Sequence, residues 1–563
     1  MTDGELDPVT LEVLRNAFTS VAEEMSANLI RTSYSPNIKE REDASCAVFD
    51  GDGRMLAQAE NIPVHLGAMP HSVRACIEAV GAEEFQPGDT VIHNSPFRGG
   101  AHLPDITFVS PVFIEEELRA YVANRAHHAD VGGARAGSVA AGSTSIYGEG
   151  LQIPPVRLFE GGSLNEDVLA LLTENVRTPT EREGDLRAQQ AANETGRRRF
   201  RALVEKHGLE TVEAAANDVQ GYSETRMRSA IEALPGGQHT FTDVMDGDGT
   251  GERDIEIVAE VTIGTDSIAV DFAGSSDQVP GPINAPIAVT TSATYYTIRA
   301  LTDPDIPPNH GCYRPISITA PEGSIVNARR PAAVVGGNLE LSQRIVDVIL
   351  GAMDEAGIEG TIAAANGSMN NVTFGGTDPD TGEPYTFYET IGGGYGARRH
   401  SDGVDGVHAH MTNTQNTPVE ALELAYPLRV HRYSLRQDTG GAGTHRGGLG
   451  IRRDIEVLGH EAEFSLLSER REHAPYGLEG GESGSRGDDR LLVDGESRAL
   501  DGKITIDLEP GTVVSIRTPG GGGFGPPADR SPAAIETDLK EERISQATAA
   551  ESYPDVAVDD EGN

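Results

Sequence analysis

Three histidines and two aspartates frame one predicted β-hairpin in the first quarter of the chain. His102 and Asp105 precede a β-rich run at 106–114, and His127, His128 and Asp130 close the returning run at 119–127. A turn over 115–118 places Asp105 opposite His127 or His128, and directly opposed residues have Cβ atoms roughly 4.5–5.5 Å apart. His102 lies in a Gly- and Pro-containing loop that can fold back. The pattern predicts a mixed histidine and carboxylate metal site at one end of the hairpin.

The residue types set the chemistry of this site. Imidazole and carboxylate ligands suit a divalent transition metal such as zinc, manganese or iron. The alternative is that these are polar loop residues that hydrogen-bond to one another. Glu60 ends another predicted hairpin, around Gly51–Gly53, and would complete the ligand set, although the sequence alone does not bring it near.

The glycine-rich stretches do not predict a nucleotide site. "GGGGFG" at 520–525 is followed by Pro526 and Pro527 instead of a helix, so no helix N-terminus is available for a phosphate. The one Gly-Lys pair, Gly502-Lys503, is followed by Ile504, which excludes a standard phosphate-binding loop.

Two further motifs can be explained by a structural role as well as by ligand binding. "DGDGTGERD" at 246–254 has Ile257 where a calcium loop needs glutamate, so we expect a turn. The segment 391–420 carries His400, His408 and His410 among glycines. It is either a substrate loop or second ligand group, or a tight bend whose polar residues satisfy buried backbone groups.

Composition excludes several classes of protein. The 563 residues carry a formal charge of −43, with lysine at four positions only. Such a field repels nucleic acid and anionic membranes, and a lysine-poor acidic surface is typical of a salt-rich cytoplasm, where screening is strong. Three scattered cysteines fit a reducing compartment. No signal peptide or apolar membrane span is recognised, so we expect a cytoplasmic protein.

The periodicity predicts a mixed α/β (α+β) chain of several units, with antiparallel β-hairpins and flanking helices. Asp7 and Pro8 begin an amphipathic helix over about 8–33. Further helices are expected near 70–80 and over 336–357. The predicted parts are 1–163 with the candidate metal site, 164–237 mainly helical, 238–360 strand-rich then helical, 361–525 glycine-rich β, and 526–563, an acidic disordered tail.

Several stretches, in order, resemble the hydantoinase B / 5-oxoprolinase family over roughly residues 5–527. They are "DPVTLEVLRNAF", "ENIPVHLGAMPHSV", "GDTVIHNSPFRGGAHLPDITFVSPVF", "RAHHADVGG", "NHGCYRPI", "GGNLELSQRIVDV", "NTQNTPVEALELAYPLRVHRYSLRQDTGGAGTHRGGLGIRRDI" and "TPGGGGFGPP". The acetone carboxylase alpha subunit is a larger relative of this family.

The resemblance implies a B-type component of an ATP-dependent cyclic-amide hydrolase that opens a hydantoin or 5-oxoproline ring. ATP would be bound by a partner A-type subunit in a hetero-oligomer. Matching motif to motif, the metal ligands would be Glu60, His102, Asp105 and His127, with His128 competing for the last position. His128 and Asp130 would be catalytic proton carriers or partners of the ligands. The alternatives are a component of an ATP-dependent ketone carboxylase and a non-catalytic scaffold.

Overall fold

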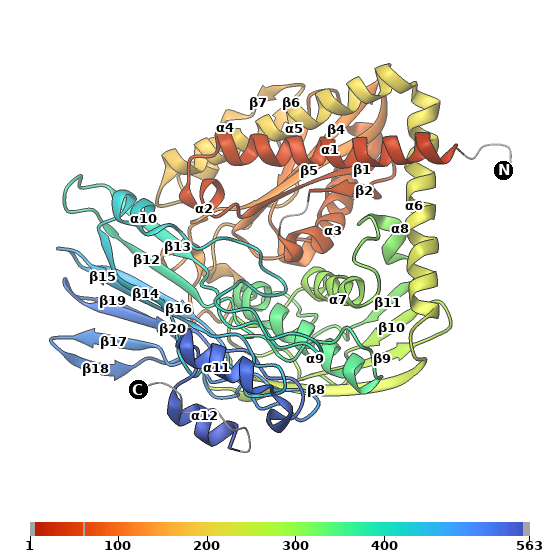
Figure 1. Ribbon diagram of the computed structural model, residues 1–563. Coiled ribbons are helices and arrows are strands. Elements are labelled where there is room, and N and C mark those ends of the chain that lie inside the picture. The colour runs from red at the N-terminus through yellow and green to blue at the C-terminus, as the bar shows by residue number, and fades with distance from the viewer. Residues whose placement is uncertain (1–5, 60–61, 555–563) are drawn as a thin grey trace.

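The computed structural model describes residues 6–59 and 62–554, and confirms the mixed α+β fold (Figure 1). Its first layer is a seven-stranded sheet in the order β2-β1-β5-β4-β3-β6-β7. The strands are β1 Ala44–Asp50, β2 Met55–Gln58, β3 Thr90–His93, β4 Asp105–Ile114, β5 Glu117–His127, β6 Val156–Glu160 and β7 Ser163–Leu164.

Helices cover both faces of this sheet. Helices α1 and α5 run together along one face (Figure 1) and share a core with Cys46, Val48 and Val122. The other face, with Ala47 and Tyr121, packs against α3. The helices of this part are α1 Pro8–Thr32, α2 Pro36–Lys39, α3 Pro63–Val80, α4 Glu166–Thr173, α5 Pro179–His207 and α6 Leu209–Glu232.

A four-stranded sheet, in the order β11-β10-β9-β8, continues the core beneath α3. Its strands are β8 Gly237–Gly247, β9 Arg253–Ile263, β10 Ile268–Asp271 and β11 Ile316–Thr319, and its helices are α7 Ile287–Leu301, α8 His310–Tyr313 and α9 Ser342–Glu355. One hydrophobic cluster joins Phe49 and Met69 of the first part to Ile257 and Ile349 of this one. The two predicted parts therefore share a single core.

The last third contains two further sheets, in the orders β13-β12-β16-β19 and β14-β15-β20-β17-β18. Their strands are β12 Asn371–Thr377, β13 Pro384–Glu389, β14 Leu428–Leu435, β15 Ile451–Val457, β16 Ala462–Leu467, β17 Arg490–Val493, β18 Glu496–Ala499, β19 Lys503–Leu508 and β20 Val513–Arg517. The remaining helices are α10 Val419–Ala425, α11 Pro532–Lys540 and α12 Gln546–Ser552.

Glycine-rich loops beside these sheets pack backbone against backbone, and we call the segments 392–396, 440–450, 476–484 and 519–523 the glycine bundle. The amides of Gly520, Gly521, Gly522 and Gly523 donate to the carbonyls of Ser485, Gly448, Ala364 and Glu482, at 2.8–3.0 Å. A Cβ at Gly520 would lie 1.8 Å from the Thr439 carbonyl oxygen. These amides already have acceptors, which explains physically why "GGGGFG" is no phosphate loop.

Several sequence predictions need correction at this level. The chain from Pro526 to Pro554 is folded where disorder is predicted: Ile535 and Ala549, on α11 and α12, pack against Ala442. Residues 555–563 lie outside the described chain. The helix expected near 70–80 already begins at Pro63. Within the described residues, no helix combines the length and apolarity needed to cross a membrane.

Candidate metal centre

The β4–β5 hairpin forms in one of the two predicted registers. Asp105 pairs with His127, and the same register continues along the hairpin until a bulge at Val112. The loop before β4 folds back as expected, because the Asp105 amide donates to the His102 carbonyl at 3.2 Å and the His128 amide donates to the Pro104 carbonyl at 2.9 Å. Three side chains from one loop and two strands therefore meet at the end of the hairpin.

Their donor atoms converge on one point. His102 Nε2 lies 3.0 Å from Asp105 Oδ1 and 3.2 Å from His127 Nδ1, and His127 Nδ1 lies 3.4 Å from Asp105 Oδ1. All three residues are buried. Within the described chain they are the one group of histidine, cysteine and acidic side chains whose ligand atoms come this close together.

This arrangement fits a divalent metal ion. Ligands bound tetrahedrally at about 2.0–2.1 Å lie roughly 3.3 Å apart, and the three separations scatter around that value. Apart from the nearby imidazoles of His102, His127 and His65, neither carboxylate oxygen of Asp105 has a hydrogen-bond partner within the described residues. A buried carboxylate is costly unless its charge is compensated, and a cation held between it and the two imidazoles would supply that compensation.

The protonation states at the centre follow from burial and from the neighbouring side chains. Burial lowers the pKa of His127, which outweighs the opposing effects of Asp105 and Asp43. Burial of Asp105 would by itself raise its pKa, but the neighbouring His102 and His65 hold that pKa well below its usual range. The centre therefore presents an ionised carboxylate and, at His127, a neutral imidazole with a lone pair, which are the forms that bind metal.

Two residues at the centre were missed by the sequence analysis. His65, in the first turn of α3, has its Nε2 3.4 Å from Asp105 Oδ1 and 3.9 Å from Asp43 Oδ1. Its Nδ1 lies 3.4 Å from the Ser45 hydroxyl. Asp43 precedes β1, and its carbonyl accepts the His127 amide at 3.0 Å. Glu60, the predicted fourth ligand, lies outside the described residues, whereas Asp43 supplies a buried carboxylate here.

His127 belongs to the centre by geometry, and His128 engages the opposite side of the sheet. His128 Nε2 lies 2.9 Å from Gln189 Oε1 on α5. Burial, together with Arg182, lowers the pKa of His128 to about 4. The His127 ring, in contrast, stacks on Tyr388 with centroids 4.4 Å apart.

Asp130 braces the loop that follows the hairpin. Its carboxylate accepts the amides of Gly132, Gly137 and Arg177 at 3.0–3.2 Å, and pairs with the Arg177 guanidinium at 2.9 Å. A carboxylate with so many donors is a structural anchor. Neither His128 nor Asp130 belongs to the group of three converging donors, so the geometry supplies no contact for their predicted catalytic roles.

The segment 391–420 reaches the rim of the centre through its backbone. The Met411 carbonyl accepts the Val64 amide, next to His65, at 3.2 Å. His408 Nε2 lies 3.0 Å from Asn416 Oδ1, and His410 Nε2 lies 3.7 Å from Asp347 Oδ1, while His400 is exposed. His408 has a partner inside the bend, whereas His410 Nε2 has no hydrogen-bond partner within the described residues, so these contacts do not choose between the two interpretations of the segment.

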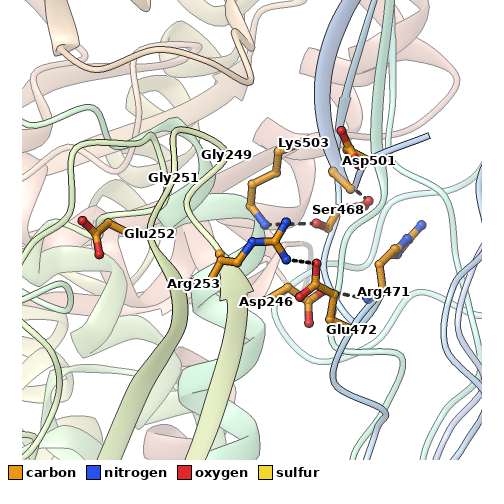
Figure 2. Close-up of a pocket in the computed structure, with 12 residues that line it drawn as sticks. Asp246, Gly249, Gly251, Glu252, Arg253, Ser468, Arg471, Glu472, Asp501 and Lys503 are labelled. Atoms are coloured by element: carbon orange, nitrogen blue, oxygen red, sulfur yellow. Dashed lines mark hydrogen bonds and ion pairs between the residues drawn. The ribbon is translucent and has the colours of Figure 1, made fainter. Parts of the chain in front are cut away.

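A separate surface cavity of about 180 Å³ lies where the β8–β9 turn meets the loops 468–472 and 501–503 (Figure 2). Its basic side chains all have acidic partners: Arg253 pairs with Glu472, Lys503 with Glu469, and Arg471 with Asp489. None of the predicted site residues lines it. We interpret it as a braced junction between sheets.

The β8–β9 connection is a turn, as expected for "DGDGTGERD". Asp248 accepts the amides of Thr250, Gly251 and Glu252 on one oxygen and that of Gly281 on the other, at 2.8–3.0 Å. Its oxygens are thus committed to backbone donors.

Sequence comparisons with known proteins all match this chain to relatives of one family. The family model described as hydantoinase B/oxoprolinase matches residues 7–527. An uncharacterised protein of Methanocaldococcus jannaschii is 44% identical, over 97% of this chain and 96% of its own length. The B component of a putative D-/L-hydantoinase from a Pseudomonas species is 33% identical over 99% and 96%. 5-Oxoprolinase 1 of Arabidopsis thaliana is 40% identical over 93% of this chain, which spans only 42% of that protein.

Solved structures agree with these sequence matches. The ATP-dependent caprolactamase of Pseudomonas jessenii superposes with a TM-score of 0.91 at 31% identity, over 99% of this chain and 98% of that one. A nucleotide-free acetone carboxylase structure superposes with a TM-score of 0.89 at 20% identity, over 97% and 79%, which establishes a shared fold. The match to the family model over nearly the whole chain shows that this protein belongs to the hydantoinase B/oxoprolinase family.

Proposed function

We propose that this chain is the metal-dependent component of an ATP-dependent hydrolase that opens cyclic amides of the hydantoin or 5-oxoproline type. The observation that carries the proposal is the convergence of His102, Asp105 and His127 on one buried point. Relatives named 5-oxoprolinase and D-/L-hydantoinase supply the substrate class.

The residues at the centre have distinct tasks in this proposal. His102, Asp105 and His127 would hold a divalent transition metal, with Asp43 as the nearby carboxylate. Such an ion supplies Lewis acidity toward a carbonyl oxygen and makes water a better nucleophile at neutral pH. His65, between the carboxylates of Asp43 and Asp105, is placed to hold a proton there, and Ser45 orients its ring.

ATP would be used by a partner subunit. A ring amide is a poor electrophile, and phosphoryl transfer to its oxygen would create a better leaving group. The sequence has no Gly-Lys-Ser/Thr loop, and the amides of the glycine bundle at 520–523 donate to its own carbonyls. An A-type subunit that binds ATP would complete the enzyme as a hetero-oligomer.

The test is to purify the chain together with an A-type partner and to assay ring opening of hydantoin and 5-oxoproline with ATP. We expect ATP-dependent turnover that is lost in His102→Ala and kept in His400→Ala, a matched change at an exposed histidine. Turnover of a ketone that requires bicarbonate would instead identify a carboxylase. Full activity of His102→Ala would refute the metal-dependent role.

A further inference from the structure

A row of buried polar side chains crosses the sheet one step inward from the candidate metal centre. Thr107 on β4 pairs with His93 on β3 and with Arg125 on β5, and Arg125 pairs with Ser45 on β1. Directly opposed residues share a face of the sheet, so these four side chains lie on the face that carries Asp105 and His127. All four are 0% exposed.

Arg125 carries its charge there without a direct ion pair in the described chain, although the charge of Asp105 acts on it from a greater distance. Its Nε donates to Thr107 Oγ1 at 2.9 Å, and its Nη2 donates to Ser72 Oγ at 2.6 Å. Its Nη1 has no acceptor within the described residues. Both acceptors are neutral hydroxyls, so the buried guanidinium lacks the directly paired anion that normally offsets its desolvation, and a cation bound at Asp105 would also neutralise the one carboxylate that acts on it.

The other fully buried arginines show how unusual this is. Five of them, Arg197, Arg344, Arg446, Arg453 and Arg470, each pair with an acidic side chain. Arg41 has no ion pair within the described chain, but each of its three nitrogens donates to a carbonyl or hydroxyl oxygen. Arg125 thus combines a missing counter-charge with a free donor.

His93 adds a second unpartnered group on the other side of Thr107. Neither of its ring nitrogens has a hydrogen-bond partner in the part of the chain that the structure describes. Burial, with the nearby Arg125, lowers the pKa of His93 to about 3, so the ring is neutral and offers one N–H donor.

We propose that Arg125, with His93 beside it, binds a small oxyanion next to the candidate metal centre. The anion is either the carboxylate of a ring substrate such as 5-oxoproline or the phosphoryl group of an activated intermediate. Arg125 and His127 are two residues apart on one strand, which spaces them by about 7 Å. That span suits a small molecule whose reacting carbonyl faces the metal donors while its anionic group meets Arg125.

Oxyanion binding is testable on the chain alone. We would titrate inorganic phosphate, and separately acetate, into full-length protein treated with a chelator, at constant ionic strength, by calorimetry. Removal of metal ensures that the ion itself does not bind the anion. We expect saturable binding of at least one anion, weakened at least about tenfold in Arg125→Gln, and unchanged in Arg119→Gln, which removes a partly exposed arginine from the same strand.

The relative affinity for the two anions identifies the source: preference for phosphate indicates the phosphoryl group, and preference for acetate indicates a substrate carboxylate. Equal binding by wild type and Arg125→Gln, or no binding of either anion to wild type, would overturn the proposal. If Arg125→Gln fails to fold, Arg125→Lys keeps the charge but loses the forked donors. It should bind more weakly than wild type, and equal affinity would exclude a role for the guanidinium.

A kinetic measurement with the partner subunit rests on the proposed function. For a carboxylate site, Arg125→Gln should raise KM for 5-oxoproline more than KM for hydantoin, which has no carboxylate. For a phosphoryl site, both substrates should be affected alike. If no cyclic amide is turned over, the proposed function is wrong, but the calorimetric result is unaffected. If turnover is normal and anion binding does not depend on Arg125, only the anion-site inference is wrong.

Discussion

At the scale of single residues, the centre depends on which of two adjacent histidines faces inward. His127 Nδ1 lies 3.4 Å from Asp105 Oδ1, and His128 Nε2 lies 2.9 Å from Gln189 Oε1. The sequence left the two open because a one-residue shift in register exchanges the faces of a strand. The pairing of Asp105 with His127 places the His127 ring beside Asp105, so we propose His127 as the ligand.

This choice gives a direct prediction. We expect about one transition-metal ion per chain in wild type, as for a single mononuclear centre, and its loss in His102→Ala and in His127→Ala. His128→Ala should retain the metal, because its ring contacts α5 instead. Metal analysis of the purified variants measures this, and metal retained in His127→Ala but lost in His128→Ala would reverse the assignment.

The residues that the sequence could not place come from elsewhere in the chain. A hairpin turn of known length sets Asp105 beside His127, so that pair is predictable from local spacing. His65 reaches the centre only because α3 packs on the sheet, and Asp43 only because β1 pairs with β5. No local pattern encodes these long-range contacts.

The buried carboxyl of Glu340, outside the candidate metal centre, has a pKa that burial shifts. Burial raises its pKa to about 8, although a hydrogen bond from Ser368 opposes this. The unfolded chain releases this proton near its ordinary pKa, whereas the folded protein keeps it up to about pH 8. Stability from this group is therefore present at low pH and is lost as pH rises from about 4.5 to 8.

Glu340→Gln removes that dependence while its amide oxygen can still accept from Asn371. Relative to wild type, the variant should become more stable as the pH rises from about 4.5 to about 8, the limits of the titration window, and denaturant unfolding at both values measures this. Glu461→Gln, at an exposed position, is the matched control. A stability difference between Glu340→Gln and wild type that does not change with pH would contradict the assignment.

At the scale of elements, most helices and hairpins follow from the sequence. Asp7 caps α1, accepting the amides of Val9 and Thr10, and the hairpin over Gly51–Gly53 forms from β1 and β2. The expected helix over 336–357 instead opens with a π-helical turn at Gly337–Leu341 before α9. A Cβ at Gly337 would lie 1.9 Å from the Asn284 carbonyl oxygen, a close approach that helical periodicity does not encode.

The glycine bundle was not predictable as a unit, because its segments join by backbone hydrogen bonds and leave no side-chain period. It gives a sharp prediction. Gly522→Ala would place a Cβ 2.0 Å from the Tyr476 carbonyl oxygen, so we expect loss of soluble, folded protein. Gly221 lies inside α6, and a Cβ added there would meet open space. Gly221→Ala should therefore increase the free energy of unfolding by about 0.5–1 kcal/mol. Thermal unfolding of both variants checks the pair, and equal midpoints would show that the bundle tolerates side chains.

At the scale of the whole molecule, the charge of −43 is the dominant feature. At low salt the carboxylates repel over a Debye length of ~30 Å at 0.01 M, against ~3 Å at 1 M. We propose that the protein is adapted to a salt-rich interior. Its thermal midpoint should rise steeply between about 0.1 and 2 M potassium chloride. A thermal midpoint that does not change with the potassium chloride concentration would indicate an acidic protein without adaptation to high salt.

The proposal that the A-type subunit, and not this chain, binds ATP gives a second prediction at this scale. The isolated chain should not hydrolyse ATP, since it has no standard phosphate-binding loop. Phosphate release from ATP, measured on the purified chain without a partner, should equal the rate without protein. Robust hydrolysis that co-elutes with the chain would place the nucleotide site here instead of in an A-type subunit.

The glycine bundle also governs when this protein can finish folding during synthesis. Its segment 519–523 binds to partners at Ala364, Gly448 and Glu482, all of which leave the ribosome earlier. Chains emerge from the N-terminus at roughly 5–20 residues per second, so the metal-centre sheet has its strands available tens of seconds before the last glycines appear. Until then the glycine loops of the C-terminal part lack the backbone partners that segment 519–523 supplies, so we expect this part of a nascent chain to be the last to fold.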